Sequence, residues 1–472
     1  MSKSFRTCDL DQPFLLPPSL QDWLPEDHLA RFIADVALAL DLSMIYGCYE
    51  RRDGRGKAAY HPLMMVRVLL YGYCVGIMSS RRIERCTYED LAFRYLSADQ
   101  HPDHDTISGF RQQHLTALAQ LFTQVLQLCN QAGLVKLGHV AIDGTKLKAN
   151  ASKHKAMSYE RMEEKERQLK AEVEKLLAQA AETDAAEDGL YGKGKRGDEL
   201  PAELARRESR LKKITEAKAA LEKQARERAE AAKKAAEEKL AQRLKKEQER
   251  GRKFGGRPPQ VPDPEQAKPE PTAQRNFTDP ESRIMPDGAI KGCFVQAYNA
   301  QAAVDGQNQI IVAAGITQDT NDKRQLLPLL EQVEKNLGRK PEAVTADAGY
   351  FSEAALTDEK VNGVDLLVPP DRLKHGAAAA LLSPPADSPP VAGAKTLPEI
   401  MRERLGSPEG HAIYKLRKQI VEPVFGQIKE ARRIRAFLLR GLGKVQAEWQ
   451  LICATHNLLK LFRAALPCPA CR

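Results

Sequence analysis

The hydrophobic positions divide the chain into a helical first part, a charged middle and a mixed second half. Residues 63–78 form a mostly apolar run that has the length of a buried helix and is too short to cross a membrane. An amphipathic stretch over 83–96 follows. After a polar break, a new helix is expected to start at Thr106, with Asp105 as its N-cap. Residues 1–135 are therefore expected to form an α-helical N-terminal domain with a probable role in DNA binding.

Two helices of this domain resemble a helix-turn-helix, because a short polar turn joins them and the second carries Arg111 near its start. An ordinary helical hairpin within a bundle has the same spacing, and the spacing alone favours that alternative. Arg111 is nevertheless a candidate DNA contact.

Short apolar runs typical of buried strands occupy residues 139–143, 294–304, 309–317, 341–346 and 364–368. Asp305-Gly306 predicts a hairpin turn between the second and third runs. A helical run separates the third strand from the fourth, and the chain becomes helical again from Glu399. Consecutive strands favour antiparallel pairing, and strands joined through a helix favour parallel pairing. The order predicts an α/β fold with a ribonuclease-H-like mixed sheet over residues 136–158 and 274–465.

A long insertion interrupts this order after the first strand. Residues 159–250 are rich in Ala, Glu, Lys, Arg and Leu, with a Gly-rich break near the middle. Residues at heptad intervals form two sets, one before and one after this break, and they would line the seam between two helices. Lys218 occupies one seam position of the second set. The other seam positions are apolar: Met162, Leu169, Val173, Leu176, Leu204, Leu211, Ile214 and Leu221. The pattern predicts an antiparallel helical hairpin of the coiled-coil type, followed by a Gly/Pro-rich linker over 251–273; residues 466–472 form a tail.

Composition narrows the class of protein further. The formal net charge of +9 suits a polyanionic partner if the positive charge gathers on one face. A hydrophobic fraction of 42% excludes a wholly disordered chain, and 29% charged residues exclude a membrane-embedded one. The nine scattered cysteines and the lack of a secretory signal lead us to expect a cytoplasmic protein with reduced thiols and no membrane partner. The pair Cys468 and Cys471 is only a weak zinc signal.

Three acidic residues stand where strands or helices could bring them together. Asp143 closes the first strand, Asp347 closes the fourth, and Glu422 lies in a helical stretch. If the two strands are neighbours, both Asp side chains emerge at the same edge of the sheet, and a helix packed there could add the Glu. Phosphodiester chemistry with two divalent ions requires such oxygen ligands for Mg²⁺ or Mn²⁺.

Each of these residues also has a structural interpretation. Asp-Gly at Asp143 is common in turns, Asp347 could cap a turn, and a helical Glu such as Glu422 is usually solvated. Asp322 is a possible fourth carboxylate, but its place before a helical run favours an N-cap.

Several motifs resemble the DDE transposases of bacterial insertion sequences. Residues 345–350 (TADAGY) are similar to the second-Asp motif of that family. Tyr414-x-x-Arg417, followed by Glu422 and then Lys429, resembles its Glu-region signature. Residues 101–111 resemble the N-terminal domain of the family. Residues 276–285 and 296–305 are similar to one subgroup, which carries a long helical insertion after the first catalytic Asp. The resemblance extends over residues 10 to 465.

The resemblance implies that Asp143, Asp347 and Glu422 form a catalytic triad that binds two Mg²⁺ or Mn²⁺ ions. The DNA contacts it implies are Tyr414, Arg417, Lys418 and Lys429. The usual signature leaves three residues between its basic residue and the Glu. Lys418 fits that spacing and Arg417 does not, so either residue could take the basic role. Because proline suits the first turn of a helix, the residue after Glu422, Pro423, predicts a helix start or a kink there.

The implied function is that of a DNA transposase. It would bind the terminal inverted repeats of its insertion sequence, cleave the double-stranded DNA ends and transfer them to target DNA. It would act as a homodimer or larger assembly, associated with the bacterial nucleoid in the cytoplasm. A stand-alone structure-specific nuclease of the same fold and a non-catalytic coiled-coil DNA-binding protein are the alternatives.

Overall fold

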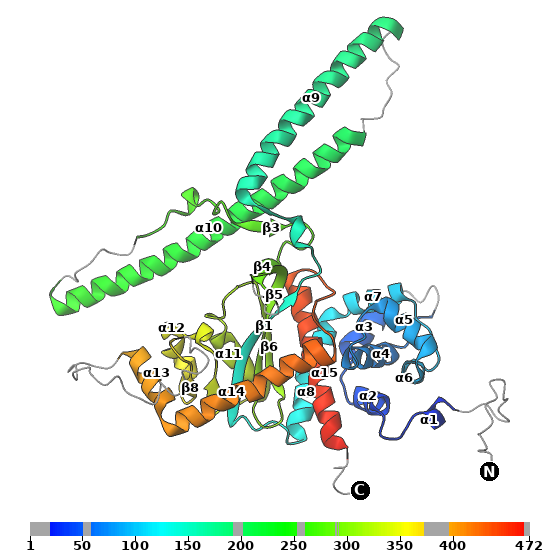
Figure 1. Cartoon of the computed structure of the whole chain (residues 1–472), viewed down its shortest axis with the longest axis vertical. Helices are drawn as coiled ribbons and strands as arrows, with labels where there is room; N and C mark the ends of the chain where they lie inside the picture. The colour runs from blue at the N-terminus through cyan, green and yellow to red at the C-terminus, as the bar shows by residue number, and fades with distance from the viewer. Residues whose placement is uncertain are drawn as a thin grey trace, which may run out of the picture. The chain divides into compact units, whose positions relative to one another are not determined.

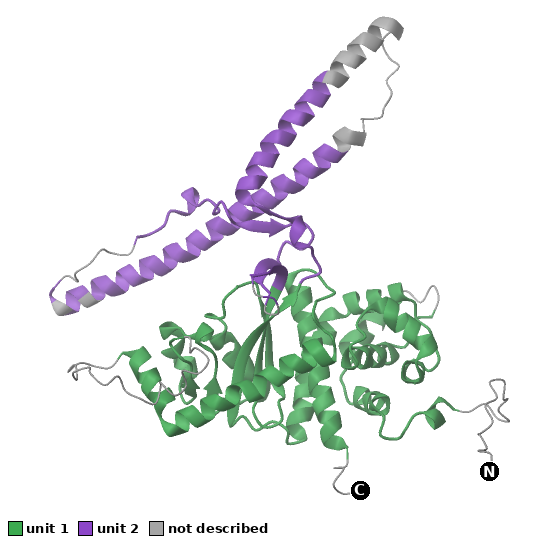
Figure 2. Ribbon diagram, in the orientation of Figure 1, with its two compact units in different colours: residues 1–148, 298–472 green, residues 149–297 purple. Residues whose placement is uncertain are grey.

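The computed structural model describes residues 19–50, 58–191, 202–252, 260–287, 290, 292–371 and 396–466. The chain divides into two compact units, residues 1–148 with 298–472 and residues 149–297 (Figure 2). Cys468 and Cys471 lie outside the described residues, as does nearly all of the predicted tail.

Helices fill the N-terminal part of the first unit, as the hydrophobic pattern predicted. They are α1 (Leu20–Trp23), α2 (Leu29–Leu38), α3 (Ser43–Glu50), α4 (Pro62–Cys74), α5 (Ser80–Glu89), α6 (Leu91–Leu96), α7 (His104–Gln113) and α8 (Leu115–Gln131).

Two helix boundaries in this region differ from the prediction. The amphipathic stretch over 83–96 is two helices, because the Asp90 side chain accepts hydrogen bonds from the backbone N–H groups of Ala92 and Phe93 and so starts α6. The predicted cap at Asp105 is wrong. Asp103 caps α7, since its carboxylate accepts from both the backbone N–H and the hydroxyl of Thr106, at 2.7 and 2.9 Å.

The first unit also holds a mixed sheet with the strand order β6-β5-β1-β7-β8. Its strands are β1 (His139–Lys148), β5 (Phe294–Asp305), β6 (Ile311–Thr317), β7 (Ala343–Thr345) and β8 (Asp365–Leu367). β5 and β6 form the predicted antiparallel hairpin, whereas β1 pairs in parallel with β7, and β7 with β8. This arrangement is compatible with a ribonuclease-H-like core.

Helices and single turns connect and cover the strands (Figure 1). α11 (Leu326–Leu337) leads from β6 to β7, and α13 (Leu397–Gly406), α14 (Pro408–Gly426) and α15 (Leu442–Ala465) follow β8. Shorter elements are η3 (Ala348–Tyr350), α12 (Glu353–Leu356), η4 (Glu359–Val361) and the π-helix Gln427–Ala431.

Amide side chains of α15 satisfy the backbone at the outer edge of the sheet. Asn457 accepts from the N–H of Ile311 and donates to its carbonyl oxygen, and Gln446 does the same for the N–H of Ile316 and the carbonyl of Ala314. These bonds cover the otherwise unpaired edge of β6 and fix α15 against it.

Pro423 lies inside α14, so the predicted helix start at this position is wrong. Because proline has no N–H, the carbonyl of Gln419 loses its usual helical partner. The side chain of Gln309 donates to that carbonyl instead, at 3.0 Å. This bond explains how α14 continues past Pro423, up to the π-helix that follows it.

The second unit contains the predicted hairpin, with α9 (Tyr159–Tyr191) and α10 (Ala202–Arg250) as its two helices. At their base are η1 (Lys153–Lys155), η2 (Pro264–Gln266) and the paired strands β2 (Ala156–Ser158) and β3 (Gln274–Asn276); β4 (Arg283–Pro286) pairs with residues 294–297 of the same unit. The hairpin core consists of Tyr159, Met162, Leu169, Ile214, Ala217 and Leu221. Lys218, the polar seam residue, is accommodated by ion pairs to Glu166 and Glu163, at 3.1 and 3.4 Å.

Truncation of the hairpin core should loosen this unit. Ile214 is 1% exposed, so Ile214→Ala is expected to destabilise the α9–α10 pairing by about 2–4 kcal/mol. Hydrogen exchange of the helical amides would show faster exchange in both helices. Leu244→Ala, at a position on α10 that is 52% exposed, is the matched control. Equal exchange in the two variants would contradict the assigned core.

Candidate active site

The parallel pairing of β1 with β7 brings Asp143 and Asp347 together. The paired residues are His139 with Ala343, Val140 with Val344, and Ala141 with Thr345. The same offset continues to the two aspartates, which follow two residues after the last pair. Asp347 itself lies beyond the end of β7, at the start of η3, and its charge acts on Asp143, so the two carboxylates lie near each other.

The Asp143 carboxylate is largely buried and paired with one cation. Its Oδ1 accepts from the backbone N–H of Gly144 at 2.8 Å, and its Oδ2 lies 3.3 Å from Nη1 of Arg417. Burial raises the pKa of Asp143 to about 6; the charges of Asp347 and Asp322 raise it as well, while Arg417 lowers it. The ionised form of this group is thus held at a cost in the metal-free structure.

α14 supplies the basic and aromatic side chains beside the aspartates. Arg417 is buried, and its guanidinium carbon lies 5.9 Å from the ring centre of Tyr414. The Nε of Arg417 has no hydrogen-bond partner within the described part of the chain. Lys418 is exposed. The structure therefore places Arg417, and not Lys418, next to Asp143, although Lys418 fits the spacing of the signature.

Lys429 approaches the same strand from the π-helix. Its Nζ donates to the carbonyl oxygen of Lys146, three residues after Asp143, at 3.0 Å. A π-helical turn often occurs at a functional site. Here it carries a positive charge to the C-terminal part of β1. The strand continues to Lys148, so the prediction that Asp143 closes it is wrong.

Two predicted site residues lie elsewhere. Glu422 is exposed, and no contact among the described residues joins it to Asp143 or Asp347. It follows Arg417 by five residues, which is a rotation of about 140° around an α-helix. Arg111 is 5% exposed and donates to the carbonyl of Met78, so it stabilises the interior of the N-terminal domain and does not offer a DNA-binding surface.

Asp322 is the residue that the sequence analysis set aside. Its predicted N-cap role is wrong, because α11 begins at Leu326 with Gln325 as its N-cap. Instead, Asp322 Oδ1 accepts from the side-chain amides of Asn299 and Gln301, each at 2.6 Å. These two polar residues alternate within the otherwise apolar strand β5, and this was the available sequence signal.

Two glycines allow these oxygens to approach the backbone closely. A Cβ at Gly144 would lie 2.9 Å from Asp322 Oδ1 and 3.0 Å from Asn299 Oδ1. A Cβ at Gly349 would lie 2.9 Å from Asp347 Oδ1 and 3.6 Å from Asp322 Oδ2. Any larger residue at either position would therefore displace these polar side chains.

The donors around these glycines suit a hard divalent cation, which prefers carboxylate and amide oxygens. The buried Oδ1 of Asn299 has no hydrogen-bond partner within the described chain. In the present side-chain positions, no group of three or more His, Cys, Asp or Glu residues in the described ranges could hold a metal ion. Arg417 currently provides the positive charge nearest to Asp143.

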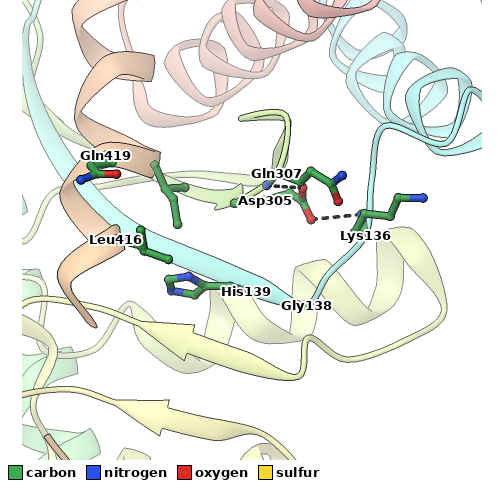
Figure 3. A pocket seen from close by; sticks show the side chains of 9 residues that line it. Lys136, Gly138, His139, Asp305, Gln307, Leu416 and Gln419 are labelled. Atoms are coloured by element: carbon green, nitrogen blue, oxygen red, sulfur yellow. Dashed lines mark hydrogen bonds between the residues drawn. The ribbon is translucent and has the colours of Figure 1, made fainter. Parts of the chain in front are cut away.

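A separate cavity lies at the other end of β1, around His139 (Figure 3). Its volume is about 340 Å³. The Asp305 carboxylate on its wall accepts backbone N–H bonds from Lys136 and Gln307, both at 3.1 Å. These bonds give Asp305 a structural role, and the candidate catalytic aspartates do not line this cavity.

Comparison with protein families gives two matches to this chain. Residues 264–458 match the model described as Transposase DDE domain, and residues 18–113 match the one described as Transposase domain (DUF772). The chain thus carries two transposase domains, which support a DDE transposase. No curated protein and no solved structure gives a significant match. Within the described residues, no helix is long and apolar enough to cross a membrane.

The buried charge predicts a stability change with pH. Because the folded-state pKa of Asp143 is raised, its ionisation weakens folding as pH rises through about 6. Asp143→Asn should therefore raise the free energy of unfolding at pH 8 by about 1–2 kcal/mol, without metal, and by about half as much at pH 5. Denaturant titration at both pH values tests this expectation. The control is Asp319→Asn, at an exposed position; a gain that did not depend on pH would contradict the assigned cause.

Proposed function

We propose that this chain is a DNA transposase that binds the terminal inverted repeats of its element, cleaves the DNA at both ends and transfers the ends to a target. The observation that carries the proposal is the pair of neighbouring carboxylates Asp143 and Asp347, flanked by Arg417 and Lys429, in a chain that matches two transposase domains. The bacterial cytoplasm, where the nucleoid lies, is the compartment that this function requires.

The reaction is an attack on a phosphodiester, first by water and then by the exposed 3′-hydroxyl. Two ions of Mg²⁺ or Mn²⁺, held by Asp143 and Asp347, would supply Lewis acidity to the attacking and leaving oxygens. The aspartates would hold the ions, and the positive charges of Arg417 and Lys429 would attract the phosphate. Burial of Asp143 favours occupancy by a cation, because a cation removes the cost of its charge.

The basic residues would bind the DNA backbone. The Nε of Arg417 is buried and has no partner among the described residues, so a phosphate oxygen that entered the site could accept from it; a planar guanidinium can make two parallel bonds. Lys429 would add a point charge from the π-helix, and the Tyr414 ring supports the guanidinium of Arg417. Glu422 is exposed on α14, the helix that also carries Arg417, and it would complete the triad that the resemblance implies.

The partner is double-stranded DNA, in agreement with the net charge of +9. Two ends must be held at once for transfer, so we propose a homodimer or larger assembly on DNA. A nuclease of the same fold would use the same site but would have no strand-transfer product.

Loss of one aspartate should abolish cleavage. Asp347→Asn is expected to lower the cleavage of a plasmid carrying the gene and its flanking DNA by at least about 100-fold, because the second acidic ligand is lost. Nicking at the element ends with Mg²⁺ or Mn²⁺, suppressed by EDTA, is the measurement. Glu353→Gln, at an exposed position, is the control. Equal cleavage by all three proteins would contradict the proposal, and cleavage without joined products would favour the nuclease.

The two adjacent basic residues should differ in their effects. Arg417→Gln is expected to reduce end cleavage about 10- to 100-fold, because it removes a buried charge-assisted contact. Lys418→Gln, one residue away and exposed, should change cleavage less than about threefold. The reverse order of effects would show that Lys418 occupies the signature position on DNA.

A further inference from the structure

A cavity of about 420 Å³ lies at the base of the helical hairpin in the second unit. One wall is the face of α10 that carries Gln224, Ala225 and Arg228. The other walls come from the segment 268–274 and from Arg283 of β4. All of these residues belong to the second unit, so this unit builds the cavity by itself.

Cations outnumber carboxylates on the walls of this cavity. Arg228, Lys268 and Arg283 line it, and Glu270 is the one acidic residue among the lining residues. Arg228 and Lys268 are exposed, and neither forms an ion pair or a side-chain hydrogen bond with the described part of the chain. The cavity therefore carries two positive charges that the described residues do not neutralise.

The apolar groups of the cavity are already used by the hairpin itself. Leu221 is 6% exposed and belongs to the hairpin core, and Ala273 packs against that core. Pro269 is buried as well. The groups that remain for a ligand are charged, or are the side-chain amides of Gln224 and Gln274. The cavity therefore suits a ligand with anionic oxygens better than an apolar one.

The loop before Arg283 holds this cation in place. Nη1 of Arg283 donates to the carbonyl oxygens of Pro280 and Ser282, both at 2.9 Å. The loop is fixed in turn by the buried Asn276, whose Oδ1 accepts from two backbone N–H groups of the loop, at 2.8 and 3.2 Å. A side chain that is ordered before binding loses less entropy when a ligand binds. The stretch 276–285, which resembles one transposase subgroup, thus fixes a positive charge on the wall of the cavity.

We propose that this cavity binds the phosphate backbone of double-stranded DNA through Arg228, Lys268 and Arg283. A guanidinium can donate two parallel hydrogen bonds to a phosphate, and a lysine adds a point charge. A cavity of this size with cations on three walls suits a stretch of polymer backbone better than a single small anion. The inference rests on the proposed function, from which it takes DNA as the partner, and it gives the inserted hairpin a part in holding that DNA.

The test is binding of a fluorescent DNA duplex with the end sequence of the element to the full chain. Anisotropy would be measured without divalent metal, at several salt concentrations. Arg228→Gln and Lys268→Gln should each weaken binding about 3- to 10-fold and lower the slope of log affinity against log salt by about 1, because each removes one phosphate contact. Glu270→Gln should strengthen binding, because it removes the one negative charge of the cavity wall.

Arg226→Gln is the matched control. Arg226 is exposed on α10 and lies two residues from Arg228, which places it on another face of the helix. This variant should change affinity less than about twofold and leave the salt slope unchanged. Circular dichroism establishes that each variant is folded, as expected for exposed positions. Lys268 lies outside the helices, so its variant decides the question even if Arg228→Gln fails to fold.

Wild-type affinity and salt slope in the folded cavity variants would overturn this inference, and the proposed function would stand if the wild type still cleaves the element ends. Loss of affinity for poly-glutamate but not for DNA would assign the cavity to an acidic protein partner and would also overturn it. Loss of DNA affinity in variants of a chain that does not cleave would support the inference and contradict the proposed function. A wild-type chain that neither binds nor cleaves DNA would overturn both.

Discussion

The parallel pairing of β1 with β7 is the contact on which the candidate site depends. Asp143 and Asp347 are 204 residues apart in the chain, and the helical hairpin lies between them. The pairing of β1 with β7 ends two residues before them and so places both near the same edge of the sheet. Because a shift of one residue would turn every side chain of a strand to the opposite face, this register decides whether the two carboxylates meet.

Neighbouring strands and helices of the first unit hold the polar groups around the aspartates in place through hydrogen bonds. Strand β5 directs Asn299 and Gln301 toward Asp322, and α15 closes the exposed edge of the neighbouring strand through amide side chains. α14 crosses near β1 and brings Arg417 to Asp143. Such groups are costly to bury unless each finds a partner, and the positive charge of Arg417 offsets only part of that cost.

Local signals were sufficient for the five strands β1 and β5–β8 and for the neighbouring positions of Asp143 and Asp347, since short apolar runs precede both residues; they did not predict the short strands β2, β3 and β4. They were insufficient where long-range contacts decide. The role of Asp322 depends on side chains of β5, more than 20 residues earlier, so the local cap interpretation failed. Spacing could not decide between Arg417 and Lys418, because the choice depends on which face of α14 packs against Asp143. Pro423 was compatible with a helix interior because Gln309 supplies the missing donor.

A crystal structure of the chain with Mn²⁺, recorded at the manganese absorption edge, tests the central claim most directly. The account predicts an anomalous peak between Asp143 and Asp347, with carboxylate oxygens of both residues about 2.0–2.4 Å from the ion. A manganese ion bound elsewhere, with Asp143 still paired to Arg417 and no peak beside Asp347, would contradict it.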